Sequence, residues 1–262
     1  MNQRKGRIAS IAGFCLLWCM ILFVAIAAVY NIAGDEALLS AEMHRHAPPK
    51  VSKLPGNQYP YMAQMIAGFL TDRQPTFQYY YTDADGNLTV CFSPHEAEHM
   101  ADCRNLVRLA GTLRWVFGVA ALLLMAAAVV LRKERKKLSF GMRIGFYSAA
   151  GLFLALLIWG AVSFDSLFTV FHRLLFTNDG WLLDASKDML IRLMPTSFFV
   201  SMAIKILLAV TAVALFGFVA AKMLQMAKGA EEEESETPEE SDTPEEPGTP
   251  ETQEAAEAVQ NA

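Results

Sequence analysis

Two histidines and a glutamate stand close together in the stretch SPHEAEHMADC, residues 93–103. His95, Glu96 and His99 spell H-E-x-x-H, a pattern in which two histidines one helical turn apart bind zinc and the glutamate acts as a general base. A catalytic zinc needs a third protein ligand. Downstream residues that could supply it are His172, Asp179 and Asp184. The motif therefore suggests a zinc hydrolase as one hypothesis.

The same stretch also has the features of a helix start. Ser93 is a good N-cap and Pro94 suits the first helical position, while Glu96 completes a capping box with Ser93. The helix should then run without interruption into the next apolar segment. On it, His99 and Asp102 share a face, so Asp102 could orient His99.

A second hypothesis needs no metal. His99 and His172 could carry out general acid–base catalysis, because a histidine with a pKa near 6.5 can take up and return a proton at neutral pH. Glu96 would then serve only to cap its helix, and His95 would be incidental. The sequence has no Gly-rich phosphate-binding loop, so no ATP-driven step is implied.

The elements that carry these residues are predicted to cross a membrane. The chain has 262 residues, of which 53% are hydrophobic, and this is too apolar for an ordinary soluble protein. Four segments approach the roughly 20 apolar residues that a spanning helix needs, at about 8–30, 109–131, 144–163 and 197–221. The fourth contains Lys205, which we expect to reach outward to the membrane surface. The predicted fold class is an α-helical integral membrane protein with a four-helix transmembrane bundle.

Basic residues set the predicted orientation. They cluster before the first span, between the second and third spans, and after the fourth, and the positive-inside rule places all three clusters in the cytoplasm. Both termini are then cytoplasmic, and the loops at about 31–106 and 164–196 face outward. Residues 1–230 would form the membrane domain. Residues 231–262 are acidic and are expected to be a disordered cytoplasmic tail that could recruit a partner.

The first outer loop is expected to form a small α+β structure. Residues 61–71 place their apolar side chains on one helical face, and this helix could lie on the bilayer surface or cap the bundle. Residues 77–82 and 88–92 read as the strands of a hairpin around a turn at 83–87. Cys91 and Cys103 share the loop and could form a disulfide.

The second outer loop is expected to continue the third helix. An apolar stripe follows residues 164–175 and is interrupted by His172. The Asn-Asp-Gly at 178–180 predicts a turn, and Asp184 is expected to cap a short helix after it. Trp181 fits the belt of aromatic residues found at membrane interfaces.

Two of these segments resemble a known family. Residues 96–103, EAEHMADC, are similar to an E-x-x-H-M-x-D-V element, and residues 171–199 are similar to a second element with Phe-His, Asn-Asp-x-Trp, spaced aspartates and Pro-x-x-Phe-Phe. Both elements are typical of the Lit family, four-span proteins that include the lipoprotein intramolecular transacylases of Gram-positive bacteria. The resemblance covers about residues 8–221. Cys103 stands where the family usually has Val, and His95 lies outside the matched positions.

Position by position, the resemblance implies that His99 and His172 are the catalytic residues. Further motif positions have less defined roles: Glu96, Asp102, Asp179, Trp181, Asp184 and Asp188. The implied reaction moves the sn-2 acyl chain of a lipoprotein's diacylglyceryl-cysteine to its free α-amino group, with no cofactor. The implied partners are membrane lipids and diacylated lipoproteins rather than nucleic acid. The implied location is the bacterial cytoplasmic membrane, with the active site at its outer face.

A non-enzymatic function remains an alternative. In a membrane adaptor, the outer loops would bind one partner and the acidic tail another. Replacing the histidines would then be harmless, whereas deleting residues 231–262 would not. A zinc hydrolase would differ from both, because it would carry about one metal per chain and lose activity with a chelator.

Overall fold

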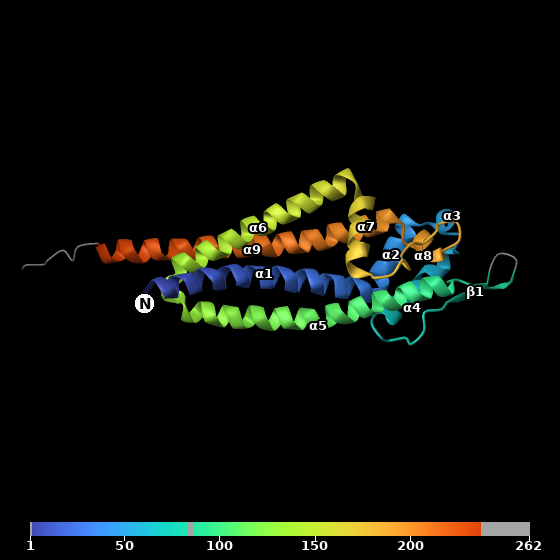
Figure 1. The fold of residues 1–262 in the computed structure, drawn as a ribbon, viewed down its shortest axis with the longest axis horizontal. Coiled ribbons are helices and arrows are strands. Elements are labelled where there is room, and N and C mark those ends of the chain that lie inside the picture. The colour runs from blue at the N-terminus through green and yellow to red at the C-terminus, as the bar shows by residue number, and fades with distance from the viewer. Residues whose placement is uncertain (1, 83–85, 237–262) are drawn as a thin grey trace, which may run out of the picture. The chain divides into compact units, whose positions relative to one another are not determined.

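The computed structural model describes residues 2–82 and 86–236, and its long elements are four helices (Figure 1). They are α1 (Asn2–Gly34), α5 (Pro94–Val130), α6 (Arg135–Val162) and α9 (Thr196–Glu236). Each has a stretch long and apolar enough to cross a membrane. The predicted fold class, a four-helix membrane bundle, is confirmed. The acidic helix formers after 230 extend α9 to Glu236, and the rest of the predicted tail, 237–262, lies outside the described residues.

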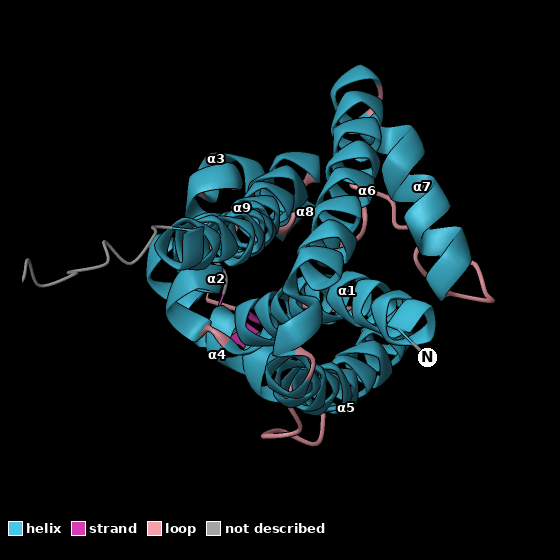
Figure 2. Ribbon diagram, turned by 90° about the vertical axis from the view of Figure 1, so that its left-hand side faces the viewer, coloured by secondary structure: helices cyan, strands magenta, loops and turns pink. Residues whose placement is uncertain are grey.

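Helix α1 lies at the centre of the bundle and packs along both α5 and α6 (Figure 2). Leu17 and Ile21 of α1 form a buried cluster with Val210 and Ala214 of α9. The short 3-10 turn η2 (Arg132–Glu134) joins α5 to α6 at the end of the bundle where the chain begins. The small outer domain lies at the opposite end.

The outer domain fills the connection between α1 and α5. It contains α2 (Glu36–His46), α3 (Pro49–Ser52), η1 (Gly56–Gln58), α4 (Tyr59–Leu70) and an antiparallel hairpin of β1 (Tyr80–Thr82) and β2 (Leu88–Val90). This confirms the expected α+β structure. Most of α4 is buried in the domain core, so of the two expectations for this helix, capping the bundle is favoured over lying on the bilayer. Cys91 and Cys103 are both free thiols.

The start of α5 is as the sequence predicted. The Ser93 hydroxyl accepts the Glu96 N–H at 3.2 Å, and the Glu96 carboxylate accepts the Ser93 N–H at 2.7 Å, so the capping box is complete. The helix then continues unbroken to Val130. His99 is therefore fixed to a rigid element that runs into the bundle.

The expected continuation of the third helix into the second outer loop is wrong. Helix α6 ends at Val162, Ser163 adopts an extended backbone, and α7 (Phe164–Leu175) starts in a new direction across the bundle (Figure 1). The Ser163 hydroxyl accepts the Ser166 N–H and so caps α7. An N-capping serine inside an apolar stripe breaks the helix, because its side chain replaces the missing backbone partner.

A buried ion pair ties the outer domain to α9. Glu42 of α2 is 3% exposed, and its carboxylate accepts the Ser201 hydroxyl at 2.6 Å and lies 3.3 Å from the Lys205 Nζ. Burial alone would raise the pKa of Glu42, but the hydrogen bonds from Ser201 and Lys205 and the Lys205 charge hold this pKa below its ordinary value. Lys205 thus reaches outward as expected, and its target is this carboxylate.

Helices α1 and α6 cross at two glycines. A Cβ added at Gly141 would collide with the Ser10 carbonyl oxygen, and one added at Gly13 would collide with the Leu138 carbonyl oxygen. Small residues let membrane helices approach to backbone contact, where van der Waals packing holds them together. The crossing therefore depends on the absence of side chains at these positions.

We expect Gly141→Val to lower the free energy of unfolding by about 1–3 kcal/mol, because α6 must move away from α1. Gly151→Val in the same helix is the matched control, since a Cβ there meets nothing within 4 Å. Denaturant titration in detergent micelles measures both. Equal losses for the two variants would contradict the close crossing.

Candidate active site

Two imidazoles from distant parts of the chain meet at the outer end of the bundle. His99 lies on α5 and His172 on α7, and their ring centroids are 6.2 Å apart. Both residues are only 7% exposed. Burial without a charged partner favours the neutral form of an imidazole. The structure thus brings together the two histidines that the sequence analysis selected.

Aromatic rings surround His172. The Phe168 ring lies 3.9 Å from its centroid, Trp181 lies at 5.1 Å and Phe176 stacks at 5.5 Å. Phe176 also packs against His99 at 5.2 Å. Desolvation in this apolar setting lowers the pKa of His172 below its ordinary value, although the bond to the Phe168 carbonyl opposes the shift. His172 is therefore available as a neutral base at pH 7.

The backbone selects the tautomer of His172. Its Nδ1 lies 2.8 Å from the Phe168 carbonyl oxygen, which can only accept a hydrogen bond. Nδ1 of the neutral ring must therefore carry the proton, and Nε2 carries the free lone pair. The nitrogen that can take a proton from a substrate is thus defined by the main chain of α7.

His99 has one unpaired nitrogen. Its Nε2 lies 3.6 Å from the Cys103 Sγ, a weak hydrogen-bonding contact, whereas its Nδ1 is buried without a partner in residues 2–82 and 86–236. A buried polar atom without a partner costs free energy, so such atoms are expected where a ligand will bind. The sequence indicated Cys103 as a possible disulfide partner of Cys91 and as a departure from the family pattern, and gave no indication of this contact with His99.

Glu96 has a structural role. It is 1% exposed, and its second carboxylate oxygen accepts the Leu190 N–H at 2.6 Å. Leu190 belongs to the short helix α8 (Met189–Leu193), so this carboxylate joins the start of α5 to the second outer loop. His95, by contrast, is exposed. In the part of the chain that the structure describes, no three His, Cys, Asp or Glu side chains are grouped to hold a metal ion, so the predicted zinc site is not assembled.

The expected roles of Asp102 and Asp184 need correction. The Asp102 carboxylate accepts a hydrogen bond from the Asn178 amide at 2.9 Å, so Asp102 anchors the loop after α7 instead of orienting His99. Asp184 accepts the Ser186 N–H and hydroxyl within a turn, and Asp188 is the N-cap of α8. The partner of Asp102 could not be predicted because Asn178 is 76 residues away, whereas the partner of Asp184 is local, since Ser186 follows it by two residues.

Of the remaining predicted positions, Trp181 joins the site and Asp179 does not. Trp181 packs on the His172 ring as described, whereas Asp179 is exposed and its carbonyl accepts the Leu182 N–H in a turn. The sequence analysis missed Phe168 and Phe176. Their spacing of four residues on either side of His172 is the available signal, since it places residues one helical turn away.

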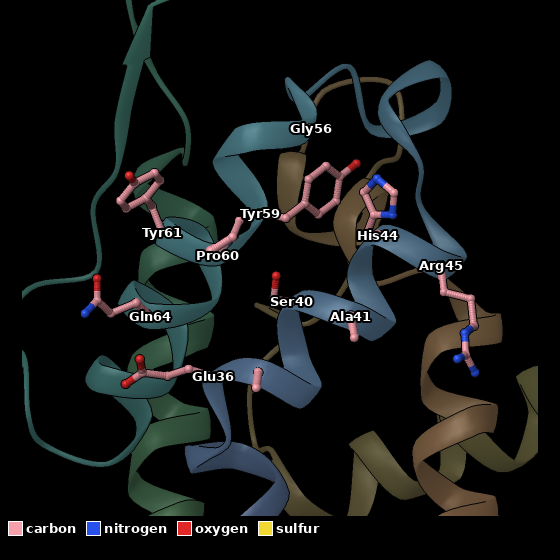
Figure 3. A pocket seen from close by; sticks show the side chains of 11 residues that line it. Glu36, Ser40, Ala41, His44, Arg45, Gly56, Tyr59, Pro60, Tyr61 and Gln64 are labelled. Carbon is pink, nitrogen blue, oxygen red and sulfur yellow. The ribbon is translucent and has the colours of Figure 1, made fainter.

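A cavity lies elsewhere in the outer domain. It has a volume of about 810 Å³ and lies between α2 and α4, where the His44 and Tyr59 rings meet edge to face (Figure 3). Neither His99 nor His172 lines it. The histidine pair, with its unpaired nitrogen, remains the better candidate for chemistry.

Together, the four long apolar helices and the paired imidazoles define a multi-pass membrane protein with a buried histidine pair at one end of the bundle. The model of the family described as lipoprotein intramolecular transacylase Lit matches residues 11–199, and the chain belongs to this family of acyltransferases. No curated protein matches the chain.

Solved structures agree with the fold. The chain is 20% identical to the membrane-integral lipoprotein intramolecular transacylase Lit from Bacillus cereus, with a TM-score of 0.64 over 88% of this chain and 100% of that one. Two variants of the same Bacillus cereus protein, with one histidine replaced by arginine or by alanine, are each 18% identical and have TM-scores of 0.62. They cover 88% and 87% of this chain and 96% and 97% of their own. At this identity the likeness supports the membrane fold.

We expect Glu96→Ala to destabilise the outer domain by roughly 2 kcal/mol or more, because two amides, those of Ser93 and Leu190, lose their buried acceptor. Exposed Glu98 on the same helix is the matched control, and Glu98→Ala should change stability by less than about 0.5 kcal/mol. Denaturant titration measures the loss, and amide hydrogen exchange should show faster exchange at Leu190. Unchanged exchange there would contradict the bridge.

Proposed function

We propose that this protein moves the sn-2 acyl chain of a lipoprotein's diacylglyceryl-cysteine onto its α-amino group, with His172 as general base and His99 as the donor that stabilises the oxyanion. The observation that carries the proposal is the bond from His172 Nδ1 to the Phe168 carbonyl, since it leaves a basic Nε2 in a buried site. The family of the chain supplies the substrate class.

The proposed first step is removal of a proton from the amine. An α-amino group has a pKa of about 7.7–8, so much of it is protonated and cannot attack at neutral pH. His172 Nε2 takes this proton, and the amine nitrogen forms a bond to the sn-2 ester carbon. The tetrahedral intermediate carries its negative charge on the former carbonyl oxygen. A donor near that oxygen lowers the barrier.

His99 is the proposed donor. A neutral imidazole has one N–H, and if the Cys103 thiol donates to Nε2, this N–H is on the unpaired Nδ1. In the second step the bond from the ester carbon to the sn-2 oxygen breaks. That oxygen takes the proton held by His172, which returns the ring to its neutral form. The neutral ring then accepts the second proton of the amine nitrogen and passes it to solvent, which leaves an amide and a free hydroxyl. Because amine and ester belong to one molecule, holding them together supplies much of the rate.

We also propose that the histidine pair faces the outside of the cell and that both termini are cytoplasmic. The basic clusters around the start of α1 and η2 lie at the end of the bundle opposite the outer domain, which supports this orientation by the positive-inside rule. Lipoproteins carry their lipid at that outer leaflet in the proposed reaction.

We expect His172→Ala and His99→Ala each to lower the transfer rate by about 10²- to 10⁴-fold, the usual contribution of a positioned acid–base group. His95→Ala is the matched control and should keep the rate, because His95 is exposed on the same helix as His99. Mass spectrometry of lipoprotein N-terminal peptides, from a strain whose lipoproteins are otherwise diacylated, measures the product. Full activity in both variants would reject the site, and no product from folded wild type would reject the function.

The pH dependence tests His172 as the base. Because its pKa lies below the ordinary value of about 6.5, the wild-type rate should stay level from about pH 8 down to about 6.5 and fall only as the pH drops further and the imidazole is protonated. His172→Gln should instead speed up as the pH rises through about 8, where the free amine forms without a base. Rates measured on a purified diacylated lipopeptide check both. Profiles of the same shape would argue against this assignment.

A further inference from the structure

One arginine lies inside an apolar run of α5 and forms no ion pair with a carboxylate among residues 2–82 and 86–236. The Arg114 guanidinium carbon lies 3.8 Å from the Tyr30 ring centroid and 5.4 Å from that of Trp115. Its Nε is buried and has no hydrogen-bond partner in the described part of the chain. A charged side chain within a membrane helix is costly, so a guanidinium with unused donors suggests a missing anionic partner.

A cavity of about 340 Å³ adjoins this side chain. It lies between α1, α5 and the turn that follows α4, and Arg114, Thr112 and Tyr30 contribute to its lining. Gly111 also lines the cavity. A side chain at this position would crowd the Tyr30 ring, since a Cβ there would be 3.0 Å from it. The cavity is therefore lined by aromatic, aliphatic, hydroxyl and charged side chains from three elements.

The charges around the cavity sum to one positive charge. Asp72 and Arg108 also line it, but they neutralise each other through hydrogen bonds of 2.6 and 2.5 Å to the two carboxylate oxygens. The remaining positive charge of the lining is that of the Arg114 guanidinium. A guanidinium presents several donors in one plane, a geometry that matches the oxygens of a phosphate.

The position of the cavity along the bundle matches the level of lipid headgroups in a membrane. Tyr30 ends the apolar run of α1, and Trp115 is 66% exposed on the bundle surface. Tyrosine and tryptophan gather at the level where headgroups meet the hydrocarbon core. A phosphate at this level could reach Arg114 from the membrane or from the adjacent water.

We propose that Arg114 and this cavity bind a singly charged phosphate group, either the phosphodiester of an anionic phospholipid or a soluble phosphate. The site is separate from the histidine pair and does not depend on the acyl transfer. The guanidinium, which lies over the Tyr30 ring, donates to the phosphate oxygens, and Thr112 lies at the cavity edge as a further polar group. Its ligand would hold α1, α5 and the turn after α4 together.

The test uses the full chain in a nonionic detergent. Dioctanoylphosphatidylglycerol should raise the thermal unfolding midpoint in a saturable way, and dioctanoylglycerol, which lacks the phosphate, should not. Arg114→Gln should weaken half-saturation by about tenfold or more. Glycerophosphoglycerol and inorganic phosphate form the third and fourth arms. A response only to the lipid identifies a phospholipid site, whereas an equal response to the soluble anions identifies a soluble ligand.

Two controls keep the test decisive. Arg132→Gln removes an exposed arginine at the other end of the bundle and should leave half-saturation unchanged. If Arg114→Gln does not fold, Thr112→Leu fills the cavity at an exposed position and should abolish the response while Arg114 is retained. A response in Arg114→Gln or Thr112→Leu equal to that of Arg132→Gln would overturn the proposal.

Discussion

The outer end of this protein depends on the buried carboxylate of Glu96. One oxygen closes the capping box at the start of α5, and the other accepts the Leu190 N–H of α8. A buried carboxylate is stable only when its oxygens are satisfied, so the two segments are held in a fixed relation. His99 follows on α5, and the loop before α8 carries Trp181, which packs on His172. The geometry of the histidine pair therefore rests on a residue that itself does no chemistry.

The surroundings of the pair favour neutral imidazoles. Phe168, Phe176 and Trp181 exclude water around His172, and this keeps the ring neutral. The same carbonyl of Phe168 that opposes the shift fixes which nitrogen is basic. The tautomer is thus set by α7, and the desolvation by α7 together with Phe176 and Trp181, which follow it.

Local signals were sufficient for much of the structure. Hydropathy identified the four long helices, turn residues identified the hairpin, and the Ser93 box identified the start of α5. The hydrogen-bond partners of several other polar side chains were not predicted correctly from the sequence. For Asp102 the partner is Asn178, 76 residues away, which the fold brings to it. For Asp184 the expected helix starts four residues later, at Asp188, and Asp184 instead bonds Ser186 within a local turn. The break between α6 and α7 at Ser163 was not predicted, because apolar residues continue on both sides of it.

The ion pair between Glu42 and Lys205 has a consequence for how the protein is made. The groups that complete the contacts of Glu42 and Glu96, beyond nearby partners such as Ser93 and Arg45, lie at Ser201, Lys205 and Leu190, in the last third of the chain. The ribosome completes these residues only after the outer domain and His99. A nascent chain therefore holds unsatisfied carboxylates and an open histidine site until its final helix is inserted. The contacts that fix the histidine pair are therefore complete only when synthesis is nearly finished.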